Sequence, residues 1–232
     1  MRVLITHETS GVMRRAFQAE GHKAISNDLR AAQDITHNHL KGDALFISRN
    51  YGPWDVIVSH PDCTYLTVSA AWAFKDPNYI KYPGVGYHQK VKPGTLTGAA
   101  RRVARDCAIS HVKELISLQP KYCKVLVIEN PIGSLTKSIG KPSLILQPHQ
   151  HGEDASKSTC LWVYGLDDFE LLPTDNIPPR MVDGRPRWAN QGDGGQNRLG
   201  PNPNRWAVRS NTYPGVAKAL AREITKRMQS HG

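Results

Sequence analysis

Several polar side chains with chemical potential directly follow short apolar runs of this sequence. They are His7, Glu8, Asp28, Asp43, Cys63, Glu129 and Asn130. A thiol can act as a nucleophile, and a carboxyl group can donate or accept a proton. Because Pro61, Asp62 and Thr64 form a turn that leaves an apolar run, we expect the Cys63 thiol to be exposed there, with a lowered pKa.

The apolar pattern predicts the elements that would bring these side chains together. The expected strands cover residues 2–6, 23–28, 54–61 and 124–131. The expected helices cover residues 12–19 and 98–118. Strands that alternate with helices imply right-handed crossovers and a doubly wound, mostly parallel α/β sheet. Ligands of such sheets bind beyond the carboxyl ends of the strands, so the polar side chains above should share one crevice.

Composition limits the class of protein and the kind of partner. The 232 residues are consistent with a single domain, 1–232, and the net charge is +10. A basic protein favours polyanionic partners, and nucleic acid leads among them. No long apolar run and no signal segment is seen, so we expect a cytoplasmic protein with no membrane partner.

The four cysteines show no C-x-x-C spacing and are expected to be free thiols. The helix over 98–118 carries an apolar stripe that includes Cys107, which we expect to be buried as packing. The same expectation holds for Cys123 and Cys160. Two histidines, His149 and His151, lie in a segment without the spacing of a metal site, so no metal is expected.

Two segments place candidate catalytic residues in an ordered pattern. HPDCT at 60–64 is similar to a strand followed by Pro-Pro-Cys-Gln, with Asp62 at the second proline and Thr64 at the glutamine. Glu129-Asn130-Pro131 is similar to a Glu-Asn-Val motif at the end of the next strand.

Two later segments continue the pattern. GEDASKSTCLWVYG at 152–165 is similar to Gly-Val-Pro-Gln-x-Arg-x-Arg followed by a strand, with Lys157 and Thr159 at the arginines. SNTYPGVAKALAREITKRM at 210–228 is similar to Gly-Asn-x-x-Pro followed by a closing helix. In this order, the four segments resemble the motifs of the C5-cytosine DNA methyltransferase family, over almost the whole chain. The chain looks closest to compact, phage-type members, with a class I methyltransferase fold.

The resemblance implies a covalent mechanism. Cys63 would add to carbon 6 of cytosine, and carbon 5 would then attack the methyl group of S-adenosylmethionine. Glu129 would act at ring nitrogen 3, which needs a raised pKa or a sheltered site; it ends an apolar strand that disfavours its charge. Asn130 would position Glu129 or contact the base. Lys157 would hold the adduct or a phosphate, or it is a surface lysine.

The segment that is expected to bind the cofactor differs from the glycine-rich motif of the family. HETSG at 7–11 keeps Gly11 but has Glu8 and Ser10 where glycines are expected. Glu8 could pair with the amino group of the cofactor, hold a substrate amino group or indicate another one-carbon donor; alternatively, these residues cap a helix. Asp28 would accept the ribose hydroxyls, and Asp43 would meet the adenine or cap a turn. The remaining cofactor contacts that the resemblance implies are Pro61 and Asn211.

Two segments are expected to contact nucleic acid. Residues 70–97 interleave aromatic and basic side chains in a mobile loop that could cover an extruded base, or they form an ordinary surface lid. The candidate contacts there are Lys75, Tyr82 and Lys90. Residues 166–209 correspond to a short recognition-like insertion, and its candidate contacts are Arg187, Arg198 and Arg205. The Gly, Pro and Asn content of residues 180–209 argues against regular structure.

Three functions therefore compete. The first is a DNA cytosine-5 methyltransferase. The second keeps the covalent mechanism but acts on a free pyrimidine nucleotide or RNA, or uses another one-carbon donor. The third is a catalytically inactive nucleic-acid-binding protein. The target sequence and the oligomeric state are not predicted.

Overall fold

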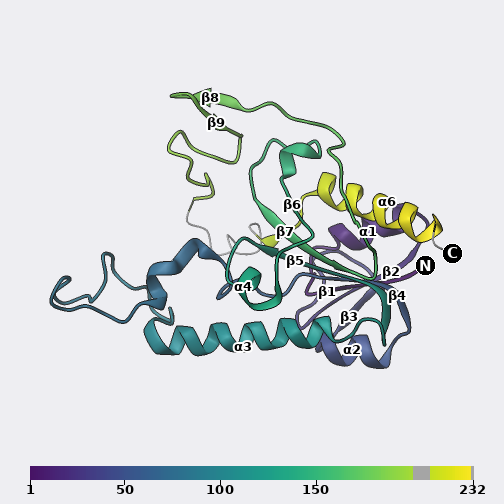
Figure 1. Cartoon of the computed structure of the whole chain (residues 1–232), viewed down its shortest axis with the longest axis horizontal. Coiled ribbons are helices and arrows are strands. Elements are labelled where there is room, and N and C mark those ends of the chain that lie inside the picture. The colour runs from purple at the N-terminus through teal and green to yellow at the C-terminus, as the bar shows by residue number, and fades with distance from the viewer. Residues whose placement is uncertain (201–209, 231–232) are drawn as a thin grey trace.

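The computed structural model describes residues 1–200 and 210–230. In this part of the chain, seven strands form one sheet in the order β3-β2-β1-β4-β5-β7-β6 (Figure 1). The strands are β1 (Arg2–Thr6), β2 (Lys23–Asp28), β3 (His39–Lys41), β4 (Trp54–Ser59), β5 (Cys123–Pro131), β6 (Leu144–Leu146) and β7 (Thr159–Tyr164). Strands β1 to β5 pair in parallel, whereas β7 runs antiparallel to both β5 and β6. This confirms the predicted doubly wound, mostly parallel α/β sheet.

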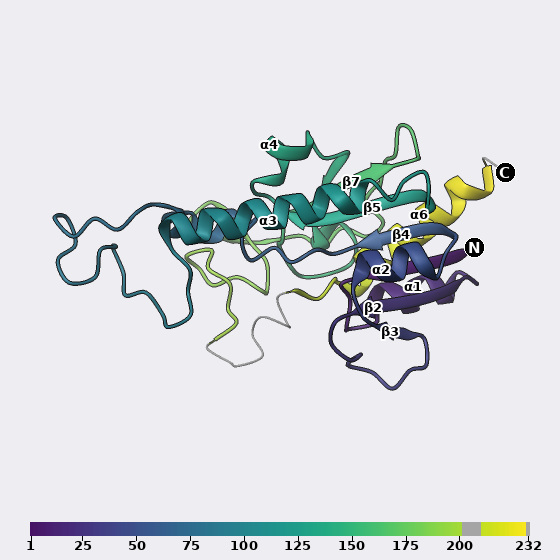
Figure 2. The same ribbon diagram turned by 90° about the horizontal axis from the view of Figure 1, so that it is seen from below.

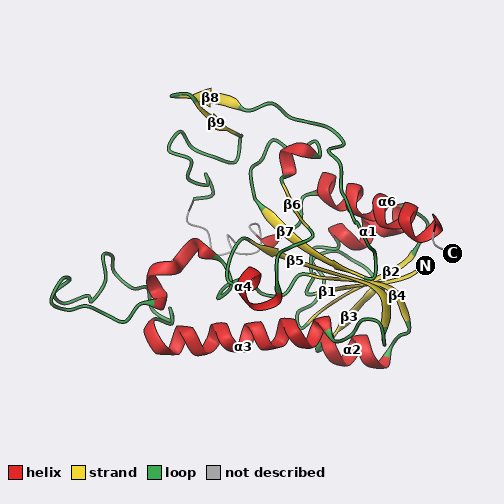
Figure 3. Ribbon diagram, in the orientation of Figure 1, coloured by secondary structure: helices red, strands yellow, loops and turns green. Residues whose placement is uncertain are grey.

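Helices cover both faces of the sheet (Figure 3). They are α1 (Val12–Ala19), α2 (Ala44–Asn50), α3 (Gly98–Ile116), α4 (Leu135–Ile139) and α6 (Pro214–Ser230). Successive strand residues point to opposite faces, so the apolar run of β5 supplies two cores. Val125 and Val127 pack in the core with α1 and α6, and Leu126 and Ile128 pack in the core with α2 and α3. All four are fully buried, as expected for a strand covered on both sides.

The C-terminal helix α6 packs beside α1 (Figure 1). His22, in the turn after α1, lies 2.7 Å from the hydroxyl of Thr225 in α6 (Nε2 to Oγ1). At the start of α6, a Cβ on Gly215 would lie 1.8 Å from the carbonyl oxygen of His151, so only glycine fits there. The close approach fixes α6 against the segment that precedes β7.

The prediction that α3 is buried along one continuous stripe is wrong for its N-terminal half. Val112 and Leu115 are fully buried against the sheet, but Val103 is 63% exposed and Cys107 is also exposed. In this half, Arg101 is buried instead, against Tyr65 and Phe74, since α3 begins beyond the strand ends and packs on the segment after β4 (Figure 2).

Two segments extend away from the sheet (Figure 1). The first contains the 3-10 helix η1 (Val68–Phe74) and a long arm before α3. The second is a hairpin of β8 (Arg180–Val182) and β9 (Arg185–Arg187), which corrects the expectation of irregular structure in this range. The hairpin forms because Asp183 and Gly184 both take positive φ angles, 48° and 70°, which suit a tight two-residue turn. Within the described ranges, no helix has the length and apolar character needed to cross a membrane.

Candidate active site

The carboxyl ends of three neighbouring strands define the candidate site. The register pairs Thr6 of β1 with Ser59 of β4, and Ser59 with Ile128 of β5. His7 and His60 directly follow β1 and β4, and Glu129 is the next residue within β5, so the three residues lie at the same level of the sheet. Parallel strands therefore gather these side chains at one edge, as the sequence pattern predicted for His7 and Glu129.

The loop that carries Cys63 is held by both neighbouring elements. The side-chain amide of Asn130, which is 1% exposed, donates to the carbonyl of Pro61 at 2.8 Å. Asp62 accepts from the backbone N–H and the hydroxyl of Thr64 at 2.9 and 2.6 Å. Arg101 of α3 donates to the Thr64 carbonyl at 3.0 Å. The Cys63 loop is thus tied to β5 on one side and to α3 on the other.

The Cys63 thiol is half-buried, which corrects the expectation of a lowered pKa. Burial raises the pKa of Cys63, and the carboxylates of Asp62 and Glu129 raise it further, whereas Lys157 opposes them. The same influences indicate that Cys63, Glu129 and Lys157 are near enough for their charges to interact. The thiol is not enclosed in the hydrophobic interior.

Glu129 lies in a sheltered but polar position. Its side chain is 16% exposed, and its Oε2 accepts from His60 Nδ1 at 3.2 Å. Burial alone would raise the pKa of Glu129, but the hydrogen bonds from His60 and Thr159 and the charge of Lys157 outweigh it and lower the pKa. The expectation of a raised pKa is therefore wrong, because strand polarity alone says nothing about these partners.

A narrow cavity lies between the end of β5, the start of β7 and the start of α6. Its lining includes Met13, Glu129, Lys157, Thr159, Thr212 and Tyr213. Lys157 Nζ donates to the carbonyl of Asn211 at 3.4 Å, and the Lys157 backbone N–H donates to Gln147 at 3.0 Å. Two candidate residues, Lys157 and Asn211, are thus in contact and lie beside the candidate acid.

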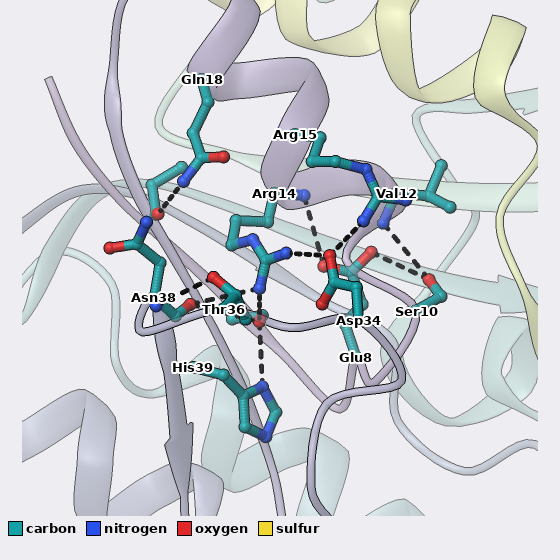
Figure 4. Close-up of polar contacts among 12 residues, drawn as sticks. Glu8, Ser10, Val12, Arg14, Arg15, Gln18, Asp34, Thr36, Asn38 and His39 are labelled. Atoms are coloured by element: carbon teal, nitrogen blue, oxygen red, sulfur yellow. Dashed lines mark hydrogen bonds and ion pairs between the residues drawn. The ribbon is translucent and has the colours of Figure 1, made fainter.

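Glu8 takes the capping role that the sequence left open as an alternative (Figure 4). Its two carboxylate oxygens accept from the backbone N–H groups of Met13 at 2.7 Å and Arg14 at 3.2 Å. The Ser10 hydroxyl also donates to Glu8 at 3.3 Å, and Gly11 enters α1 with a φ of 68°. A carboxylate therefore occupies the positive end of α1. The predicted contacts of Glu8, Ser10 and Gly11 with a cofactor stay predictions.

Asp28 and Asp43 also make local contacts. Asp28 is 9% exposed and accepts from the backbone and the guanidinium of Arg30 at 2.9 and 3.2 Å. Asp43 caps α2, because its carboxylate accepts from the N–H of Phe46 at 2.8 Å. Their predicted contacts with ribose and adenine are untested. Between them, the Oδ1 atom of Asn27 is buried and lacks a hydrogen-bond partner among the described residues.

Two histidines of the site were not assigned a role from the sequence. His7 Nε2 lies 3.1 Å from His111 Nε2, and its Nδ1 lies 3.2 Å from the hydroxyls of Thr6 and Ser59. The second is His60, and only the parallel register of β4 and β5 could have indicated its contact with Glu129. Within residues 1–200 and 210–230, no three His, Cys, Asp or Glu side chains are grouped as metal ligands.

The candidate nucleic-acid contacts differ in the solvent exposure of their side chains. Lys75 and Lys90 are exposed, whereas Tyr82 is partly covered, with Lys81 Nζ 5.4 Å from its ring centre. In the same segment, Trp72 packs edge-on against Tyr87, which is 7% exposed, so part of the aromatic content supports the arm itself.

The arginines of the hairpin region also divide into two groups. Arg187 donates to the carbonyls of Pro186 and Asp193, and Arg180 pairs with the Asp193 carboxylate at 2.6 Å. Arg198 is exposed, and Arg205 lies outside the described residues. Arg185, which the sequence reasoning did not single out, is exposed beside the hairpin turn and has no side-chain partner within the described part of the chain.

Comparisons with known proteins give a limited result. No protein-family model and no curated protein sequence matches this chain. Among solved structures, the chain is similar to an E. coli prophage-encoded protein described as a DNA modification methyltransferase, with a TM-score of 0.41 and 13% identity. The match covers 77% of this chain and 52% of that one, so this chain spans about half the length of that protein. The fold assignment rests on the strand order and register described above.

Proposed function

We propose that this chain is a DNA cytosine-5 methyltransferase that uses S-adenosylmethionine and a covalent bond between Cys63 and carbon 6. The observation that carries the proposal is that the Cys63 loop is hydrogen-bonded to the end of β5. Asn130 fixes the Pro61 carbonyl, and the charges of Glu129 and Lys157 both act on the thiol. A nucleophile, a proton-handling carboxyl and a cation within mutual electrostatic reach suit addition to a pyrimidine ring.

The side chains divide the chemistry as follows. The Cys63 thiol releases its proton to water, the thiolate sulfur forms a bond to carbon 6, and the ring electrons move toward carbon 5 and nitrogen 3. Glu129 donates a proton to nitrogen 3, and Lys157 stabilises negative charge near the site. When bound, S-adenosylmethionine supplies an electrophilic methyl group for carbon 5. A water molecule then takes the proton from carbon 5, nitrogen 3 returns its proton to Glu129, and the Cys63 thiolate is expelled.

The residues at the ends of β2 and β3 are chemically suited to such a cofactor. Asp28 offers a nearly buried carboxylate to hydroxyl groups, and the exposed Asp43 offers its carboxylate to an amino group. The buried Asn27 Oδ1 atom, unpartnered among the described residues, can accept a further hydrogen bond. The turn between β1 and α1 differs most from a cofactor-binding turn. The Glu8 carboxylate accepts hydrogen bonds from α1 amide groups that a glycine-rich turn would leave open to the cofactor.

A nucleic-acid substrate is supported by charge. The chain carries a net charge of +10, and Lys75, Lys90 and Arg185 are exposed at the two segments that extend from the sheet. An arginine such as Arg185, whose guanidinium has no partner among the described residues, can reach from a two-stranded ribbon to a phosphate or a base edge in the major groove. We therefore assign DNA as the substrate and Arg185 as a contact.

Mechanism-based trapping tests the proposal. The protein is incubated with S-adenosylmethionine and a DNA duplex that contains 5-fluorocytosine, and covalent adducts are separated on denaturing gels. We expect an adduct with the wild type and with Cys107→Ser, a matched exposed control, but none with Cys63→Ser. Absence of the adduct with DNA would refute the proposal, and an adduct with RNA or a free nucleotide instead would reassign the substrate.

A further inference from the structure

We propose that His60 is a positioning residue that shares a proton with Glu129, so that the Glu129 carboxyl can serve as the acid of this site. The inference rests on the proposed function and extends it to a residue outside the motifs that suggested that function. It is carried by the position of the imidazole ring and by the surroundings of its two nitrogens.

The backbone and the side chain of His60 hold the ring between two strand ends. The His60 N–H donates to the carbonyl of Thr6 in β1 at 3.1 Å, which continues the pairing of β4 with β1. The His60 side chain is 10% exposed, and Nδ1 lies 3.2 Å from Glu129 Oε2. With both partners in a parallel sheet, the contact depends on strand register rather than on a flexible loop.

The other ring nitrogen of His60 is free to take a second partner. Nε2 is buried and makes no hydrogen bond within the described part of the chain. A buried polar atom without a partner is costly, so such an atom is expected to meet a ligand or an ordered water when the site is filled. His60 thus offers one nitrogen to the carboxyl and another through which a proton can enter or leave.

The surroundings of Glu129 explain why a partner for the proton is needed. Thr159 and Lys157 near the start of β7, together with His60, favour the carboxylate form of Glu129. A carboxylate has no proton to donate to ring nitrogen 3. When His60 is an imidazolium, its Nδ1–H bond breaks and an O–H bond forms on Glu129 Oε2, which leaves a neutral imidazole and a carboxylic acid. The acid then protonates nitrogen 3, and the reverse transfer restores the starting state.

Other charged groups face this pair and must be considered in any titration. His7 approaches from β1, Lys157 from the segment before β7, and Cys63 from the loop after β4. Lys157 opposes protonation of Glu129. The thiol becomes negative only when it ionises, which would then favour a proton on the pair.

The first experiment uses the free protein and needs no activity. The carboxyl carbon of Glu129 is followed by NMR in protein labelled with ¹³C-glutamate, and the signal is assigned with Glu129→Gln. In the wild type, we expect the chemical shift of this carbon to show two inflections as the pH is varied, the second of which reports ionisation of the neighbouring imidazole. We expect His60→Asn to lose the second inflection. His37→Asn, at an exposed histidine, is the matched control and should retain both inflections. A single inflection in the wild type would overturn the proposal.

The second experiment separates proton sharing from a purely structural role. An asparagine amide can replace Nδ1 as a donor to Glu129, but it cannot carry the exchangeable proton of an imidazolium. We expect His60→Asn to slow single-turnover adduct formation about 100-fold, with DNA affinity within twofold of the wild type. A wild-type rate in His60→Asn would reduce His60 to a structural donor and overturn the proposal.

The two experiments also distinguish this inference from the proposed function. If the wild type forms no adduct but its Glu129 signal shows both inflections, the methyltransferase proposal fails while the shared proton stands. If adducts form and the second inflection is missing, the reaction stands and the role of His60 falls.

Discussion

Replacement of His7 by asparagine should make the stability of the protein less sensitive to acid. Burial, and next the nearby His111, lower the pKa of His7 from 6.5 to about 4. His60 also lowers this pKa, whereas the carboxylates of Asp28 and Asp43 oppose the shift. His7 is also a non-glycine residue with a φ of 59°, and asparagine tolerates that left-handed backbone well. His7→Asn therefore removes the titrating group without adding backbone strain.

The size and sign of the effect follow from the two pKa values. Between about pH 6.5 and 4, the unfolded chain binds a proton at His7 that the folded chain does not bind. The free energy of unfolding therefore falls as the pH is lowered through this window and levels off below the folded-state pKa. Between pH 7 and 4.5, this one group should reduce the free energy of unfolding by about 2 kcal/mol. His7→Asn should lack this part of the decline.

Urea denaturation, followed by tryptophan fluorescence, measures the difference. The buried Trp54 and Trp162 report on the core, and a common m-value at each pH is needed for the comparison. The lost contacts of His7 with Thr6 and Ser59 should lower stability at every pH, so the test concerns the slope and not the absolute value. His37→Asn, at an exposed position, should retain the wild-type slope.

Parallel pH profiles for the wild type and His7→Asn would refute the reasoning. Such a result would mean that the folded protein accepts a proton at His7 near its ordinary pKa. The imidazole would then have access to water or to a carboxylate, and the account of burial at the end of β1 would be wrong.

Four further predictions concern single residues. Glu8→Gln should lower the free energy of unfolding by about 1 kcal/mol in urea denaturation, because the α1 amides lose a charged acceptor; unchanged stability would contradict the capping role. Gly215→Ala should lower the melting temperature in calorimetry, because its Cβ would overlap the carbonyl of His151; a wild-type value would show that α6 can shift. Arg185→Gln should weaken DNA binding and reduce the salt slope by about one ion, measured by fluorescence anisotropy, and an unchanged slope would remove Arg185 from the interface. Alkylation of Cys63 by iodoacetamide should accelerate from pH 7 to 9, because the pKa of the thiol is raised, and a plateau below pH 8 would contradict this.

Strands β1, β2, β4 and β5 could be predicted from the sequence because each run ends at a polar residue or a breaker, whereas the three-residue strands β3 and β6 were not predicted. The bounds of β1 and β2 match the predicted runs, and β5 differs from the prediction by a single residue, Cys123. The helix α3 shows where the pattern fails. An apolar stripe predicts a buried face only while the sheet lies beneath it, and the sequence does not show that α3 begins beyond the strand ends.

The grouping of candidate residues at the strand ends could be predicted from the sequence, but the direction of their pKa shifts could not. The signs of the pKa shifts of Cys63 and Glu129 were both predicted wrongly, because they depend on partners from other elements. His60 and Glu129 are 69 positions apart and meet only through the register of β4 and β5. Likewise, the composition of the hairpin region could not indicate that Arg187 is used within the loop while Arg185 is exposed.

The alternation of side chains along β5 explains how neighbouring residues can serve different parts of one site. Ile128 belongs to the core on the side of α3, so Asn130, two residues later, lies on that side and reaches the Pro61 carbonyl of the Cys63 loop. Glu129 lies on the opposite side, where α1 and α6 pack, and it lines the cavity with Lys157. The same strand thus fixes the loop of the nucleophile from one face and presents the carboxyl from the other. Only the strand end, where the two faces meet, allows both side chains to act on Cys63.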